Sequence, residues 1–375
     1  MASCFAQTGC DSCVTEERVA SSLLMRIYSS PSVEVTVLRP ESLSRRKLPV
    51  NFNQDDLSIF SHELERVIPQ TQLLKLHNVG VSAEGILFRK GKMLPQSFAF
   101  PANRENWKRR SVLKFILSNY LFRRRRRFEK ESAWVVDDWS AGYFHWLADV
   151  LPRLFTIRER LKDLVLLLPH KYKELEFVQA SLQPFTIGSV EYIEASEVLL
   201  SRKLIVPTQT APSGHYNEEL IREVRNLLVG FYASGPRETP GDRVYISRSL
   251  APKRRIFNEE EAIEVLREFN FRIIRPEDHS FAEQVRIASQ ARCLVSNHGA
   301  GLTNMLFMSP GTSVLELRHA SDRINNCYFT LASALNLNYF YQSCEPEKRD
   351  EDPHTGDLKV DSRALRANLE SMLAS

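Results

Sequence analysis

The chain has 375 residues, a length at which the hydrophobic core is usually divided between two domains. Hydrophobic residues make up 43% and charged residues 26%, and no uninterrupted apolar stretch is long enough to cross a bilayer, which excludes a membrane-spanning class. A net charge of +4 is too mild to indicate a nucleic-acid partner by itself, although Arg123 to Arg127 form an unbroken arginine run.

Residues 1–32 show little periodicity, and we expect a flexible amino-terminal arm there. The first residues lack the basic and then apolar order of a secretory signal, which predicts a cytoplasmic protein with reduced thiols. Cys4, Cys10 and Cys13 lie close together, but no fourth ligand follows at the spacing of a zinc finger. We therefore predict no metal site, with a zinc site as the alternative.

Ordered structure is expected from Val33, where an alternating, β-branched segment predicts a strand. Residues 73–94 alternate as in a hairpin, with Gly80 and Gly85 as turn positions. The segment SAWVVDDWS predicts a buried strand that ends in a loop, and YFHWLADVLPRLFTIRERL after it has a helical period and one proline. Residues 165–169 predict another short buried strand.

The second half of the chain alternates strand and helix patterns, which is typical of a parallel sheet with helices on its faces. Three strand–helix–strand steps fit between Arg243 and Leu317, with Ser280 as the cap of one helix. This pattern predicts a Rossmann-like half. The segment PTQTAPSG, residues 207–214, is rich in turn formers and is the predicted linker between two domains.

The segment NHGAGLTN places two glycines between a strand and a short helix. At the carboxyl end of such a strand, helix N–H groups favour anions. Gly299 and Gly301 can take positive φ and let a phosphate approach the backbone, and Asn297, His298 and Thr303 can add donors. We predict a diphosphate site here. The alternative is a tight turn without a ligand, because a GxG pattern alone is weak evidence.

Arg248 follows another strand of the same predicted sheet, and Lys253, Arg254 and Arg255 follow it in a loop. Guanidinium groups suit bidentate phosphate contacts, although a solvated basic loop is the alternative. Glu316 ends the next strand, where a carboxylate can accept both ribose hydroxyls or pair with a nearby arginine.

His145, Asp149 and Arg153 are spaced four residues apart, so a helix carries them on one face. A carboxylate beside a histidine can act as a general base on a hydroxyl, and an arginine can bind an anion. The alternative is a salt-bridge ladder on a helix surface. Tyr143 and Trp146 belong to the apolar flank of the same helix.

With both groups of residues in view, the sequence resembles glycosyltransferase family 61, which comprises capsular-polysaccharide, plant xylan-type and vertebrate O-linked N-acetylglucosaminyltransferases. The matching segments are GYFHWLADVLPRL, YISRSLAPKRRIFNEEE, EDHSFAEQVRIASQARCLVSNHGAGLTNMLF and PGTSVLEL. They occur in family order and together span most of residues 134–320.

The resemblance implies an α/β fold of the GT-B type, in which two Rossmann-like domains face each other across a cleft. We expect an acceptor-side domain at residues 33–212, a nucleotide-sugar-binding domain at 213–345 and a carboxy-terminal tail and helix at 346–375. The resemblance also implies inverting transfer from a nucleotide sugar, typically UDP-linked.

Matched to the motifs of the family, His145 and Asp149 are the expected catalytic residues, the base being Asp149 or His145 assisted by Asp149. Tyr143, Trp146 and Arg153 are expected on the acceptor side. The matched motifs also include Ser247 and Glu259. The expected donor-binding residues are Arg248, Arg254, Arg255, Asn258, His298, Gly299, Ala300, Gly301, Thr303, Asn304 and Glu316.

Inverting transfer needs a base for the acceptor proton and positive groups for the departing nucleoside diphosphate. Because arginines and helix dipoles can supply that charge, we expect no metal and no other cofactor. Asp137 and Asp138 are adjacent and so do not form a DxD motif.

The sequence therefore predicts an inverting, metal-independent glycosyltransferase of the cytoplasm that acts on a glycan or lipid-linked acceptor in surface or capsular polysaccharide synthesis. One alternative is a non-catalytic protein that binds nucleotide sugars. Another is a binder of nucleic acid or of an anionic membrane surface through Arg123–Arg127, although no nucleic-acid recognition motif surrounds that run. The oligomeric state has no sequence signal.

Overall fold

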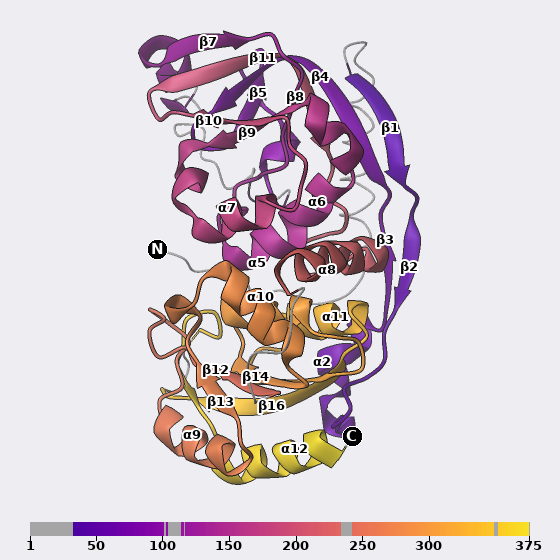
Figure 1. Ribbon diagram of the computed structural model, residues 1–375, viewed down its shortest axis with the longest axis vertical. Coiled ribbons are helices and arrows are strands. Elements are labelled where there is room, and N and C mark those ends of the chain that lie inside the picture. Colours follow the sequence, from indigo (N-terminus) through magenta and orange to yellow (C-terminus); the bar gives the residue numbers. More distant parts are fainter. Residues whose placement is uncertain are drawn as a thin grey trace.

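The computed structural model describes residues 33–100, 103, 114, 115, 117–233, 242–348 and 352–374. The predicted arm at residues 1–32, with Cys4, Cys10 and Cys13, lies outside the described residues. Two sheets lie towards opposite ends of the molecule with helices between them, and a further helical layer lies beyond the second sheet (Figure 1). The predicted α/β class is confirmed.

The first sheet is mixed and comes from the amino-terminal half of the chain. Its strands are β1 (Val33–Arg39), β4 (Thr71–Ser82), β5 (Leu87–Arg89), β6 (Lys92–Met93), β7 (Arg124–Phe128), β8 (Ser132–Ala133), β9 (Val165–Pro169), β10 (Ser189–Ile193) and β11 (Glu197–Pro207). The order is β10-β9-β8-β11-β4-β5-β6, with β1 beside β4 and β7 beside β11. Strands β7 to β11 pair in parallel, and β4 joins β11 in antiparallel orientation. A separate ladder joins β2 (Ser42–Arg45) to β3 (Glu65–Ile68).

The second sheet is parallel except at one edge. Its strands are β12 (Arg243–Ile246), β13 (Arg272–Ile274), β14 (Cys293–Asn297), β15 (Ser313–His319), β16 (Asn338–Pro346) and β17 (Leu358–Lys359). They are ordered β13-β12-β14-β15-β16-β17, and only β17 runs antiparallel to its neighbour. Every residue of β14 and β15 is buried, as expected of strands covered on both faces.

Helices cover both faces of the second sheet, and others lie against the first. They are α2 (Leu57–Phe60), α5 (Tyr143–His145), α6 (Leu151–Phe155), α7 (Glu176–Leu182), α8 (Glu218–Tyr232), α9 (Glu259–Glu268), α10 (Phe281–Gln290), α11 (Cys327–Ala334) and α12 (Ser362–Ala374). Alternate strand residues divide between two cores: Tyr245 and Val295 pack with α9 and α12, whereas Val244 and Leu294 pack with α10. None of the helices within the described ranges is long and apolar enough to span a membrane.

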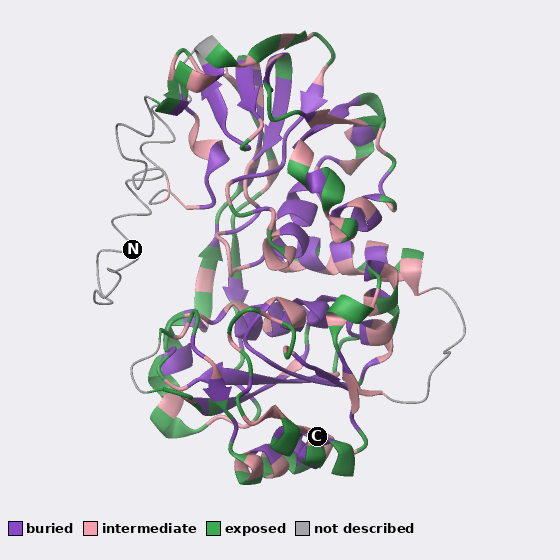
Figure 2. Cartoon of the chain, turned by 90° about the vertical axis from the view of Figure 1, so that its left-hand side faces the viewer, coloured by how far each residue is buried: buried purple, intermediate pink, exposed green. Residues whose placement is uncertain are grey.

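One apolar core joins the two sheets. It extends from Leu74 on β4, through Leu228 on α8, to Leu294 on β14. Figure 2 shows buried residues filling the sheets and the helices between them. The amino-terminal part of the chain also reaches the second sheet, because the ring of Phe60 lies 5.0 Å from that of Tyr341. The amino-terminal and carboxy-terminal halves of the chain are therefore packed together at more than one place.

The strand–helix alternation predicted between Arg243 and Leu317 is confirmed, including a capping box in which Ser280 and Glu283 cap α10. The predicted hairpin around residue 85 is also present, and Gly85 has a φ of 95° in its turn. Gly80 is a correction, because it lies inside β4 rather than in a turn. A side chain at Gly80 would collide with the ring of Phe88 on β5, so close packing explains this glycine.

Candidate active site

The order of strands in the second sheet reverses between β12 and β14. The chain passes from β12 outward to β13 and then returns past β12 to β14. In open α/β sheets, ligands bind beyond the carboxyl ends of the strands that flank such a reversal. Ser247 and Arg248 follow β12, and His298 and Gly299 follow β14. The topology thus brings together the two donor-side motifs that the sequence analysis identified.

Arg248 lies directly against the glycine turn. A Cβ atom added to Gly299 would come within 2.5 Å of a guanidinium nitrogen of Arg248, and one added to Gly301 would come within 2.8 Å of the side chain of Ile246. Gly299 has an extended backbone with a φ of 162°, and Gly301 is not among the glycines with positive φ. The predicted positive φ is therefore corrected: these glycines are required because neighbouring side chains approach them closely.

Two guanidinium groups meet at this site without acidic partners. Arg248 donates to the backbone carbonyls of Lys253 (3.2 Å) and Arg254 (3.4 Å). Burial lowers the pKa of Arg248, and the neighbouring charge of Arg254 lowers it further. Arg254 has a left-handed φ of 56°, and its buried Nε has no hydrogen-bond partner. Neither side chain forms an ion pair within the described ranges, so an anion would relieve their repulsion.

Arg255 and Asn258 have other partners. The guanidinium of Arg255 pairs with Asp357 at 3.0 Å, and the amide of Asn258 binds the backbone of Val360 through both its N–H (2.9 Å) and its carbonyl (2.9 Å). Glu259 accepts a hydrogen bond from Tyr245. Arg255 and Asn258 attach the Arg248–Arg254 loop to the carboxy-terminal segment, and their predicted contact with the donor stays a prediction.

His298 is held by a buried carboxylate. Its Nδ1 lies 2.5 Å from Glu316, whose other oxygen accepts from Tyr339 at 2.5 Å, and its Nε2 lies 3.1 Å from the amide nitrogen of Asn325. Burial opposes ionisation of Glu316, but the hydrogen bond and charge of His298 outweigh it, so the pKa of Glu316 is lowered. Because Glu316 is fully buried with both oxygens engaged, it orients His298 and is not placed to receive ribose hydroxyls.

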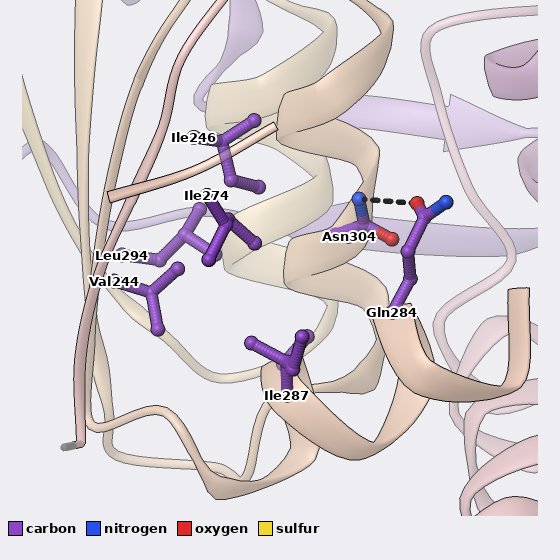
Figure 3. A pocket seen from close by; sticks show the side chains of 8 residues that line it. Val244, Ile246, Ile274, Gln284, Ile287, Leu294 and Asn304 are labelled. Atoms are coloured by element: carbon purple, nitrogen blue, oxygen red, sulfur yellow. Dashed lines mark hydrogen bonds between the residues drawn. The ribbon is translucent and has the colours of Figure 1, made fainter. Parts of the chain in front are cut away.

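The helix after the glycine turn is a 3-10 helix, Ala300–Phe307, in which Thr303 is fully buried. Asn304 donates to the carbonyl of Gly301 and to Gln284, and its carbonyl oxygen accepts from Tyr143 at 2.7 Å. Figure 3 shows the Asn304–Gln284 bond at one side of a pocket that both residues line. That pocket lies between the sheet and α10 and is lined by Val244, Ile246, Ile274, Gln284, Ile287, Ala288, Leu294 and Asn304. Its apolar walls belong to the core.

The first sheet has a reversal of its own, between β8 and β11. From β8 the chain goes outward to β9 and β10 and then returns to β11 on the other side of β8. The segment after β8 leads to His145 and Asp149, and the segment after β11 contains Ser213. The catalytic residues expected from the sequence therefore also lie beyond the carboxyl ends of two strands that flank a reversal.

His145, Asp149 and Ser213 form one hydrogen-bonded group. The Nδ1 atom of His145 lies 2.8 Å from Oδ2 of Asp149, and the hydroxyl of Ser213 donates to that same oxygen at 2.8 Å. The side chain of His145 is 22% exposed and that of Asp149 is 10% exposed. With Nδ1–H donating to Asp149, Nε2 is left as a hydrogen-bond acceptor. The arrangement is that of a histidine base oriented by a carboxylate.

The predicted helix after residue 142 contains a π-helical turn, Trp146–Val150, between α5 and α6. Its last N–H bond runs from Leu151 back five residues to Trp146, immediately before Pro152, which has no N–H. Such π turns are frequent at functional sites.

Two of the three residues predicted on the acceptor side are corrected by their burial. Trp146 has no exposed surface, and its indole N–H donates to Ser181 at 2.7 Å. Arg153 is 1% exposed and donates to the carbonyl of Pro207 (3.1 Å) and to Asp137 (3.3 Å). Burial lowers the pKa of Arg153, and Asp137 partly offsets this. Neither side chain faces an acceptor, and the alternative of a surface ladder also fails for Arg153.

Tyr143 and Tyr328 join the two sites. The hydroxyl of Tyr143, in the amino-terminal half of the chain, donates to Asn304 in the carboxy-terminal half. Burial raises the pKa of Tyr143. The ring of Tyr328 lies 5.7 Å from that of Phe144 and 4.9 Å from that of His298, and its hydroxyl donates to the carbonyl of Gly299 at 2.6 Å. The sites therefore share a wall. Sequence reasoning missed Tyr328 and Ser213; for Ser213, the position just after a buried strand was an available signal.

Comparison with known proteins agrees with this class of site. Residues 143–315 match the family Glycosyltransferase 61. This range contains the histidine–carboxylate pair and the Arg248–Gly299 site. The resemblance predicted from the sequence motifs is thereby confirmed for this part of the chain.

The similar curated proteins are named as N-acetylglucosaminyltransferases. Protein O-linked-mannose beta-1,4-N-acetylglucosaminyltransferase 2 of Mus musculus is 40% identical over 108 residues, which are 28% of this chain and 18% of that protein. The protein of the same name from Xenopus tropicalis is 47% identical over 77 residues, 20% of this chain and 13% of that protein. EGF domain-specific O-linked N-acetylglucosamine transferase of Mus musculus is 31% identical over 111 residues, 28% and 21% of the two chains. The matched segments thus cover about a fifth or less of these relatives.

Proposed function

We propose that this chain is an inverting glycosyltransferase of the GT-B type that uses a nucleoside diphosphate sugar, with UDP as the first candidate nucleotide. The observation that carries the proposal is the pairing of two sites at one junction. A histidine–carboxylate pair follows the strands of one sheet, and two arginines that form no ion pair with the residues described follow the strands of the other. Both lie within the range that matches the glycosyltransferase family.

In the proposed reaction, Nε2 of His145 removes the proton of an acceptor hydroxyl as its oxygen attacks the anomeric carbon of the donor. Asp149 orients His145 and stabilises the imidazolium, and Ser213 holds Asp149. The bond from the anomeric carbon to the phosphate oxygen breaks, and the nucleoside diphosphate leaves. This chemistry favours the second of the two predicted assignments, in which His145 is the base.

Arg248, Arg254 and the N–H groups of the turn at residues 298–301 are proposed to bind the diphosphate and to stabilise its developing charge. Glu316 does not contact the diphosphate itself but orients His298 beside it. Since these groups supply the positive charge, we expect transfer to continue in the presence of a metal chelator. The capsular role expected from the sequence finds no support in the relatives, whose names describe modification of O-linked mannose and of EGF domains.

A thermal-shift titration with UDP, GDP, ADP and CMP tests the donor site. A ligand that binds only the folded protein raises its melting temperature by an amount set by its concentration relative to Kd. We expect UDP to stabilise the wild type and to lose this effect in Arg248→Ala. Arg366→Ala is the matched control, because Arg366 is an arginine of α12, which packs on the opposite face of the same sheet, and pairs with Glu268. No shift with any of the four nucleotides would overturn the proposal.

The alternative of an anionic partner for Arg123–Arg127 is less well supported. Arg123 pairs with Glu84, Arg124 lies 3.7 Å from Glu197, and Arg126 pairs with Glu191 and Glu197, each at 2.9 Å. Hydrogen bonding to Glu197 raises the pKa of Arg126. An anionic partner would have to compete with these carboxylates. The run lies largely in β7, where charged side chains also discourage pairing with another strand.

A further inference from the structure

Trp139 is a large apolar side chain that the core does not use. It is 43% exposed, whereas Trp134 and Trp146 are fully buried. It follows β8 in the loop that leads to His145, and its ring lies 5.0 Å from the imidazole of His145 at an angle of 61°. An exposed tryptophan beside a proposed base requires an explanation, because burial of its ring would otherwise stabilise the fold.

The loop that carries Trp139 is fixed rather than loose. The N–H of Trp139 donates to Asp137 at 3.1 Å, and Asp137 exchanges hydrogen bonds with Ser140, each of 2.8 Å. Asp137 also forms an ion pair with the buried guanidinium of Arg153, at 3.3 Å. The N–H of Asp138 donates to the carbonyl of Ser97 at 3.0 Å. The exposed ring is therefore held in place by bonds on both sides of it, as a preorganised contact surface would be.

Polar groups border the ring. The ring of Phe100 lies 4.8 Å from that of Trp139, and the neighbouring Ala99 accepts a hydrogen bond from Gln209 at 3.0 Å. Asp138 accepts from the amide of Asn103 at 2.9 Å, and burial raises the pKa of its carboxyl group. The segments next to Trp139 and Phe100 thus carry a carboxyl group and two amides, which are groups that can donate to or accept from hydroxyls.

We propose that Trp139 is the platform on which a pyranose ring of the acceptor stacks. The inference rests on the proposed transferase function and goes beyond it by naming a carbohydrate, rather than a bare peptide, as the group that presents the reactive hydroxyl. A pyranose has one face of C–H groups, which suits the negative face of an indole, and a rim of hydroxyls, which suits the polar border of this site. A sugar stacked there directs its edge towards His145.

The nucleotide is the less suitable occupant of this surface. Trp139 follows a strand of the first sheet, whereas the arginines that would bind the diphosphate follow a strand of the second. Leu250 and Phe257, which are 55% and 65% exposed, lie in the same loop as Arg254 and are better placed for a nucleobase. The acceptor and the donor therefore have separate apolar surfaces.

Saturation-transfer NMR on the full chain with UDP present tests the inference. The probes are the methyl pyranosides of xylose, mannose, glucose, galactose and N-acetylglucosamine, together with an unglycosylated peptide rich in serine and threonine. We expect at least one pyranoside to bind, and Trp139→Ala to weaken that binding about tenfold, the scale of one lost aromatic contact. Trp139→Phe should retain most of it. Phe122→Ala is the control, because Phe122 is an 84% exposed aromatic residue before β7.

The UDP thermal shift of each variant separates the two levels of inference. If UDP stabilises both the wild type and Trp139→Ala while pyranoside binding is lost only in Trp139→Ala, the platform is supported. If UDP binds but no pyranoside does, if Trp139→Ala binds pyranosides as the wild type does, or if only the peptide binds, the platform is overturned and the transferase proposal stands. If none of UDP, GDP, ADP and CMP stabilises the wild type, the proposed function itself fails.

Discussion

The two sheets carry histidine–carboxylate pairs of the same construction, and the pairs differ in what surrounds the second ring nitrogen. In each pair Nδ1 faces the carboxylate, Asp149 for His145 and Glu316 for His298. Asn325 occupies Nε2 of His298, whereas Nε2 of His145 has no hydrogen bond within the described part of the chain. Glu316 is fully buried, but Asp149 keeps 10% of its side-chain surface. One pair is closed, with both ring nitrogens hydrogen-bonded, and the other is open, with only Nδ1 bonded within the described residues.

This difference shows how one motif serves two purposes. A histidine whose two nitrogens are both engaged fixes the turn that faces Arg248, and it cannot exchange a proton without breaking a bond. A histidine with one engaged nitrogen is oriented and still able to accept a proton. The carboxylate alone does not identify the base. In the proposed reaction the second nitrogen does, because Nε2 of His298 is hydrogen-bonded and Nε2 of His145 has no such bond within the described residues.

The largest expected effect comes from His145→Ala. Removing a positioned base should lower the rate of sugar transfer by roughly 10²- to 10⁴-fold. Donor binding should persist, because the arginines belong to the other sheet. The measurement is the initial rate of transfer from the nucleotide sugar identified by thermal shift, together with the UDP shift of the variant. Transfer within tenfold of the wild-type rate would remove His145 from the role of base, and an equal loss in Asp149→Asn would support the pair acting as a unit.

Glu316→Gln probes the closed pair. It replaces a buried carboxylate that has two hydrogen-bond partners, so we expect a loss of about 1–3 kcal/mol in unfolding free energy, measured by urea denaturation at pH 7. Glu268→Gln is the control. Glu268 pairs with Arg366, but it is an exposed residue of α9, so its replacement should leave the midpoint nearly unchanged.

The same comparison has a defined pH dependence. The folded-state pKa of Glu316 lies below the ordinary value of 4.5, so its ionised form stabilises the fold above that pH. This contribution is lost as the pH falls below 4.5 and through the folded value. The difference in stability between wild type and Glu316→Gln should therefore shrink in acid. A difference that stays constant from pH 7 to pH 3 would show that Glu316 acts through packing alone.

Glycines next to the two histidine pairs give a sharper contrast. A Cβ atom at Gly299 would meet the guanidinium of Arg248 at 2.5 Å, whereas one at Gly142 would lie at an ordinary 3.5 Å from the ring of His145. Gly299→Ala should therefore displace Arg248 and weaken UDP binding about tenfold, on the scale of one charge-assisted contact. Gly142→Ala should leave both UDP binding and transfer nearly unchanged. Calorimetric titration with UDP measures the first effect, and equal affinities in the two variants would contradict it.

The sequence was sufficient to predict the residues whose neighbours are local or fixed by topology. The spacing of four residues between His145 and Asp149 predicted their contact, and the alternation of strands and helices placed Arg248 and His298 at the same sheet edge. These inferences depend only on helical periodicity and on the rule that parallel strands end together.

Other features depend on packing that a single sequence does not reveal. Arg153 shares the four-residue spacing, but a π turn and the partner Asp137 direct it into the core. Trp146 was assigned to the acceptor side because periodicity does not tell which apolar residues of a helix are covered. Gly299 was explained by its dihedral freedom, whereas the deciding fact is a side chain 51 positions earlier in the chain.

Sequence reasoning did not find Ser213, because its partner Asp149 is 64 residues away and Ser213 lies in the predicted linker. Its hydroxyl donates to the oxygen that His145 also faces. Ser213→Ala should lower kcat by about three- to tenfold, a fraction of the cost of losing the base, because the remaining hydrogen bond still orients His145. Donor KM should not change, since Ser213 does not contact the arginine site.

Rescue by a second hydroxyl distinguishes positioning from a merely structural role of Ser213. Ser213→Thr keeps a hydroxyl that can donate to Asp149 and should restore the wild-type kcat, whereas Ser213→Val has nearly the shape of threonine without the donor and should stay as slow as Ser213→Ala. If valine restores kcat as threonine does, or if threonine fails to restore it, Ser213 serves only to pack the loop after β11, and His145 and Asp149 act without it.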